Sequence, residues 1–77
     1  IVGPIKKILS LDGKHYVEII SLDNGMFQFI ETSQQLDKGD EYQYPFFYMM
    51  PTHWSGLYDT AESAERDARL SLHWLRD

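Results

Sequence analysis

The stretch that decides the fold is ILSLDGKHYVEIISLDNGMF, residues 8–27. It contains ILSLDG at residues 8–13 and a near-repeat, IISLDNG, at residues 19–25. Asp-Gly and Asn-Gly between β-branched and aromatic residues are the strongest short-range signal of a β-hairpin, because Asn, Asp and Gly tolerate the positive φ angles of a two-residue turn. The near-repeat is therefore interpreted as two consecutive hairpins rather than as a duplicated ligand loop. Strands are predicted over residues 5–11, 14–22 and 26–32.

Two-residue turns fix the register of these strands, so that Leu9 pairs with Tyr16 and Ile20 pairs with Phe29. One face of the sheet then gathers the predicted core, which consists of Ile5, Leu9, Leu11, Tyr16, Ile20, Leu22, Phe27 and Phe29. The opposite face is too apolar for an ordinary solvent face, and its apolar residues are Ile8, Val17, Ile19, Met26 and Ile30.

A fourth strand is predicted over residues 42–50, after a loop at residues 33–41 whose composition is polar. Pro45 has no N–H to donate to a ladder, so this strand lies at a sheet edge or begins after the proline.

A C-terminal helix is predicted over residues 60–76, with Thr60 as its N-cap. Small and apolar residues recur at spacings of three and four along one stripe, namely Ala61, Ala64, Ala68, Leu72 and Leu75. Glu65 and Arg69 form an i,i+4 pair in the favourable order, as do Glu62 and Arg66. The predicted fold is α+β: a three- to four-stranded antiparallel β-meander with one C-terminal α-helix packed on one face, in a single domain over residues 1–77.

Composition narrows the classes of function. The chain has 77 residues, twelve acidic and seven basic side chains, a formal charge of −5 and no cysteine. Disulfides and thiolate metal sites are excluded, and no basic stripe for nucleic acid is present. There is no apolar run long enough for a membrane span and no signal-peptide pattern at residues 1–4, so a cytoplasmic location is the default expectation. Because so small a domain has a thin core, self-association is a serious hypothesis.

Little in the sequence indicates catalysis or metal binding. His53, Ser55 and Asp59 supply the residue types of a hydroxyl-nucleophile triad, but no nucleophile-elbow pattern surrounds the serine. His15 and His73 lack metal-ligand spacing to any other histidine or carboxylate. We therefore expect no catalytic residues, no metal and no cofactor.

Leu70 and Trp74 fall on the side of the helix opposite the alanine stripe, one turn apart. An apolar pair in that position indicates either contact with another chain or packing under the loop at residues 33–41 or the fourth strand. The candidate interface consists of this pair with part of the second sheet face, namely Leu70, Trp74, Ile8, Val17, Ile19 and Ile30.

The densest feature is the aromatic and methionine run at residues 42–54. Such residues suit adaptable binding, or they complete the core and cover a sheet edge. The candidate ligand-binding residues in and beside this run are His53, Trp54, Tyr58, Phe47 and Met49.

The stretch SGLYDTAESAERDA, residues 55–68, resembles the strand-to-helix junction of short uncharacterised bacterial proteins, in which a small antiparallel sheet precedes one helix entered through Gly-x-Tyr-x-[Ser/Thr]. The matching residues are Gly56, Tyr58, Thr60, Ala61, Ala64 and Ala68. This resemblance implies the fold and no activity. The three-strands-and-helix order is also similar to the plant ethylene-response-factor type of DNA-binding domain, whose sheet is basic, whereas this sheet offers Glu18, Gln28 and Glu31.

These observations predict a small non-catalytic protein-binding module that self-associates as a homodimer or binds another protein, without nucleic acid or membrane. The alternatives are a small-ligand or accessory subunit that uses residues 46–58 and, more weakly, an acidic inhibitor that mimics nucleic acid.

Overall fold

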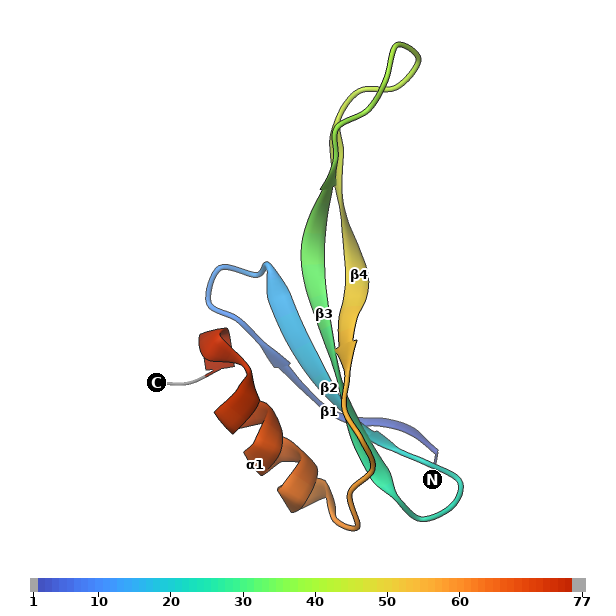
Figure 1. Cartoon of the computed structure of the whole chain (residues 1–77), viewed down its shortest axis with the longest axis vertical. Coiled ribbons are helices and arrows are strands. Elements are labelled where there is room, and N and C mark those ends of the chain that lie inside the picture. Colours follow the sequence, from blue (N-terminus) through green and yellow to red (C-terminus); the bar gives the residue numbers. More distant parts are fainter. Residues whose placement is uncertain (1, 76–77) are drawn as a thin grey trace.

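The computed structural model describes residues 2–75. The chain forms β1 (Gly3–Leu9), β2 (His15–Ser21), β3 (Phe27–Asp37) and β4 (Phe46–Trp54), then α1 (Ala61–Ser71) and a 3-10 turn, η1 (His73–Leu75). The strands form one antiparallel sheet in the order β1-β2-β3-β4, and α1 lies across one face of it (Figure 1). This arrangement confirms the predicted α+β meander with a C-terminal helix. No helix in residues 2–75 has the length and apolar character needed to span a bilayer.

The first hairpin keeps the predicted register between Lys6 and Leu9 but has a wider loop, and the register shifts by one residue between Pro4 and Lys6. Ser10 N donates to His15 O at 2.9 Å, and Gly13, with φ at +73°, donates its N–H to Ser10 O at 3.2 Å. The Asp12 carboxylate accepts hydrogen bonds from Ser10 Oγ at 2.6 Å and from Lys14 N at 2.9 Å, and these bonds lower the pKa of Asp12. Leu9 pairs with Tyr16, as predicted.

The second hairpin differs from the prediction by one residue, and this changes the core. Leu22 N donates to Met26 O at 2.9 Å, so the loop holds three residues, 23–25, with Gly25 in the left-handed region at φ +82°. Ile19 therefore pairs with Phe29, in place of the predicted pair of Ile20 and Phe29. Because side chains alternate along a strand, this slip puts Phe29 on the same face as Ile19.

The core lies between this face and the helix. Its buried members are Val17, Ile19, Phe29, Ala64, Ala68, Leu72 and Leu75, and Ile8, Phe27, Tyr58, Ala61 and Trp74 pack against them. The predicted core face was therefore wrong for β1 and β2, since Val17 and Ile19 of β2 are buried instead. Ile5 and Leu9 of β1 are exposed, as is Leu11 in the hairpin loop. The alanine stripe was predicted correctly, and its small side chains let α1 approach the sheet closely.

The helix begins as predicted and ends early. Thr60 Oγ1 accepts a hydrogen bond from Ser63 N at 3.1 Å, which confirms it as the N-cap. Leu72 has extended backbone angles, so α1 ends at Ser71 and the chain turns through η1 to bury Leu75. The predicted end at residue 76 lies outside the described residues.

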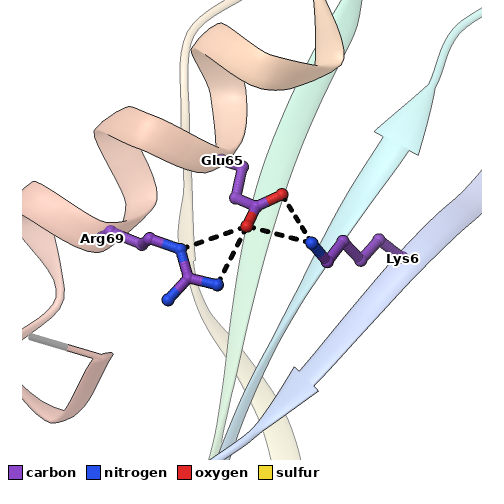
Figure 2. Close-up of polar contacts among 3 residues, drawn as sticks. All are labelled: Lys6, Glu65 and Arg69. Atoms are coloured by element: carbon purple, nitrogen blue, oxygen red, sulfur yellow. Dashed lines mark hydrogen bonds and ion pairs between the residues drawn. The ribbon is translucent and has the colours of Figure 1, made fainter.

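One carboxylate joins the helix to the edge of the sheet (Figure 2). Glu65 accepts from Lys6 Nζ at 2.8 and 3.0 Å and from Arg69 at 2.9 and 3.1 Å. These bonds lower the pKa of Glu65, and the bonds from Lys6 have a larger effect than those from Arg69. The i,i+4 pair predicted for Glu65 and Arg69 is confirmed, and the long-range contact to β1 adds a tie across the two layers.

Candidate functional site

A two-stranded ribbon projects beyond the body of the protein (Figure 1). The pairing of β2 with β3 ends at Ser33, whereas the pairing of β3 with β4 continues to Asp37 and Phe46. We call residues 34–50 the arm. It contributes to an elongated shape with principal extents of 48 × 30 × 17 Å. The predicted loop at residues 33–41 is thus mostly strand, because β3 is longer than its polar composition indicates.

Local hydrogen bonds shape the tip of the arm. Asp40 N donates to Gln43 O at 2.9 Å, and Gln43 N donates back to Asp40 O at 3.3 Å. The carboxylates of Asp37 and Asp40 accept from Gly39 N and Tyr42 N, each at 2.8 Å. The acidic residues at the tip therefore close the turn, which is a structural use of their charge. Pro45 ends the turn, and β4 begins at the next residue and lies at a sheet edge, which are the two outcomes expected of the proline. The predicted bounds of 42–50 were wrong, because β4 extends from Phe46 to Trp54.

The β4 half of the arm, residues 46–50, is apolar on both faces and exposed on both. Phe46, Tyr48 and Met50 pair with alternate residues of β3, Asp37, Gln35 and Ser33, which continue the core face. Leu36, Phe47 and Met49 lie on the opposite face. The exposed fractions are 39% for Phe46, 64% for Phe47, 40% for Tyr48, 41% for Met49 and 50% for Met50.

All nine residues of β4 are exposed, and none of them is Asp, Glu, Lys or Arg. Monomeric proteins rarely expose a continuous apolar strand of this kind, because it invites association. The arm is therefore the candidate functional site, and the candidate chemistry is non-covalent contact with another chain.

The predicted ligand-binding residues do not share one pocket. His53 and Tyr58 lie on the core face against Phe29, with ring centroids 5.7 and 6.1 Å from that of Phe29. Burial and a hydrogen bond to Asp67 raise the pKa of Tyr58. Phe47, Met49 and Trp54 lie on the opposite face, where they pair with Leu36, Gln34 and Ile30. A hollow at the arm tip is lined by residues 38–45 and includes none of these five.

Three of the predicted interface residues lie under the helix of the same chain. Val17 and Ile19 are fully buried, and Ile8 packs beside them. The interface expectation for these residues was wrong because the register slip placed the Val17 and Ile19 face of β2 beside Phe29 on the core side of the sheet. Ile30 remains on the opposite face and is half-buried, and Leu70 is 61% exposed on the outer side of α1.

Trp74 packs inside the chain rather than against another one, but it does so on β2 and β3, in place of the expected loop at residues 33–41 or fourth strand. Its Nε1 donates to Glu31 Oε2 at 2.7 Å, and its ring stacks on His15 with a centroid distance of 5.6 Å and an interplanar angle of 14°. His15 Nδ1 in turn lies 2.8 Å from Ser33 Oγ. Sequence reasoning missed this network, because nothing local to Trp74 indicates which strand residues it meets.

The remaining polar candidates have structural partners. Ser55 Oγ accepts from Phe29 N at 2.8 Å and donates to Gly56 O at 2.7 Å, which engages the hydroxyl with the backbone on both sides. Within residues 2–75 no group of three or more His, Asp or Glu side chains is placed to hold a metal ion.

Comparison of the chain with protein-family models, with curated proteins and with solved structures finds no match.

Proposed function

We propose that this chain is a non-catalytic protein-binding module that binds through the arm, and that it self-associates. The observation that carries the proposal is the run of nine exposed, uncharged residues in β4 on a chain whose formal charge is −5. Large apolar side chains with no charged neighbour in the strand favour burial against another protein surface.

The energetics of the arm support the same proposal. A two-stranded ribbon is marginally stable in water, and a third strand or a packed face is needed for it to persist. Among residues 2–75 the arm has neither beyond Gln34, whose N–H donates to Lys14 O at 2.7 Å, since β2 ends its pairing at Ser33. Methionine and aromatic side chains adapt to a partner surface, which suits residues 46–50 to this role.

The test is absolute mass in solution, by light scattering behind a sizing column over a hundredfold range of concentration. We expect the mass to rise towards twice that of one chain. Phe47→Glu places a charge in the apolar arm and should weaken association by about tenfold or more, which corresponds to about 1.4 kcal/mol.

Two controls locate the contact. Leu11→Glu makes the same chemical change at another exposed leucine, in the first hairpin loop, and should leave association unchanged. Leu70→Glu tests the outer side of α1. If Leu70→Glu dissociates the dimer while Phe47→Glu associates like the unmodified chain, the binding surface lies on the helix. That result would contradict the proposal.

A further inference from the structure

We infer that two copies associate edge to edge through β4, with residues 46–50 of each paired antiparallel about a two-fold axis at Tyr48. This inference rests on the proposed function, because it specifies how the arm of one copy meets the arm of another. In this arrangement Tyr48 faces its own equivalent, and Phe46 faces Met50 of the second copy. The two four-stranded sheets become one sheet, with both helices on the same side.

The outer edge of β4 is available for such pairing. β4 is the last strand of the sheet, and within residues 2–75 the one strand that pairs with it is β3. An edge strand presents unpaired N–H and C=O groups, which another strand can satisfy. A second copy would convert the two-stranded arm into a four-stranded ribbon, which supplies the additional strands that the arm lacks.

The sequence bounds the paired segment at both ends. Pro45 precedes residues 46–50, and Pro51 follows them. Beyond residue 50 the ladder with β3 is interrupted, since Thr32 pairs with Pro51 but Glu31 pairs with His53. Prolines and bulges limit strand pairing, so the regular edge is residues 46–50. Pairing centred on Tyr48 places Pro45 of one copy opposite Pro51 of the other, so the segment is complementary to itself.

The other edge strand carries the features that prevent pairing. β1 contains Pro4, a register shift between Pro4 and Lys6, and the adjacent charges of Lys6 and Lys7. Lysines, prolines and bulges are the usual protection of an exposed edge. Residues 46–50 contain none of them, and this contrast assigns the contact to β4.

Charge selects the antiparallel direction. The arm tip carries Asp37, Lys38, Asp40 and Glu41, a net charge of −2. Parallel pairing would place the two acidic tips side by side. Antiparallel pairing puts them on opposite sides of the two-fold axis, separated by at least the length of the five-residue segment, about 17 Å. That separation is about twice the screening length at physiological salt, so the tips repel little.

Cysteine cross-linking tests this geometry, because the chain has no cysteine of its own. Antiparallel neighbours directly across a ladder have Cα atoms about 4.5–5.5 Å apart, which is within disulfide reach. Phe46→Cys copies mixed with Met50→Cys copies should therefore form a mixed disulfide, identified by mass, while Tyr48 stays in place. Tyr48→Cys should also cross-link to itself.

Two further variants make the result specific. Met50→Cys alone should not cross-link, because its two equivalents lie about 14 Å apart along the strand. Ile5→Cys reports pairing through β1 and should also stay reduced. The same mixtures, oxidised in denaturant, measure how much of each disulfide forms by random collision of unfolded chains.

The outcomes separate this inference from the proposed function. Preferential 46–50 and 48–48 disulfides under native conditions support it. A dimer by mass whose disulfides form at Ile5→Cys, or equally at every position, would overturn edge pairing at β4 and leave self-association standing. A chain that remains monomeric over the whole concentration range would overturn both.

Discussion

Trp74 donates its indole N–H to the carboxylate of Glu31, 43 residues away in the sequence, across 2.7 Å. The same ring stacks on His15 of β2, so the C-terminal turn contacts two neighbouring strands of the sheet. This turn carries Leu75 into the core and closes the end of the layer between α1 and the sheet. Trp74 is therefore part of the fold, and the longest continuous run of exposed, large apolar side chains lies in the arm, at residues 46–50.

Trp74→Ala should destabilise the protein by about 2–3 kcal/mol, because it removes a large, partly buried side chain and leaves the Glu31 carboxylate without this donor. Trp74→Phe keeps most of the packing and should cost about 1 kcal/mol for the lost hydrogen bond. Urea unfolding followed by circular dichroism measures both. His73→Ala, at an exposed residue of the same turn, should change stability by less than about 0.5 kcal/mol. Equal stability of Trp74→Ala and the unmodified chain would contradict the packing role.

Glu65→Gln should reduce stability at neutral pH by about 1 kcal/mol, since it removes the charge shared by Lys6 and Arg69 in partly exposed pairs. The sign of the pH effect follows from the lowered pKa of Glu65. The stabilisation is complete above the pKa of an unfolded glutamate, about 4.3, and is lost as the pH falls through the lower pKa of the folded state.

The measurement is urea unfolding of both proteins from pH 7 down to the acid limit of folding. The two stability curves should converge as the pH falls below about 4. Glu41→Gln removes one charge at the arm tip without breaking a described ion pair, and it should change stability at neutral pH by less than about 0.5 kcal/mol. A constant difference between Glu65→Gln and the unmodified chain at all pH values would rule out the electrostatic explanation.

The three-residue loop that sets the core register depends on Gly25, whose φ is +82°. Gly25→Ala should destabilise by about 1–2 kcal/mol, because a Cβ is unfavourable in the left-handed region even with open space around it. Gly56→Ala is the matched control. Gly56 has no left-handed φ and equal space, so the substitution should be neutral or slightly stabilising. Thermal unfolding of the two variants compares them directly, and a smaller loss for Gly25→Ala than for Gly56→Ala would refute the loop assignment.

The features predicted correctly from the sequence depend on local chemistry. Thr60 caps the helix because its hydroxyl reaches a backbone N–H three residues away, and Ala64 and Ala68 share a face by spacing alone. Pro45 fixes the start of β4 for an equally local reason. The second hairpin was harder, because Asn24-Gly25 suits both a two-residue and a three-residue loop. That single residue decides which side of β2 lies beside Phe29 in the core.

The site was predicted in part. The apolar run at residues 42–54 was recognised, but its place on a projecting arm was not, because the length of β3 is set by its partner. Residues 33–36, Ser-Gln-Gln-Leu, have a composition typical of a loop, yet they pair with residues 47–50 of β4. Trp74 and Glu31 could not be joined from the sequence, because a contact over that separation depends on how the layers pack. Burial of Val17 and Ile19 follows from the register and could not be assigned before it.

Amide hydrogen exchange should divide the protein into a protected body and a concentration-dependent arm. The N–H groups of Val17, Ile19 and Phe29 lie in the buried centre of the sheet, so their exchange should follow global unfolding at every concentration. The outward-facing N–H groups of residues 46–50 have solvent on one side in a single copy and a strand in the proposed pair. They should exchange about tenfold or more faster on dilution below the association midpoint. Phe47→Glu supplies the control, since its arm should exchange rapidly at high concentration as well. Arm exchange that stays equally slow on dilution would mean that the arm is stable alone, and would remove the energetic reason for a second copy to cover it.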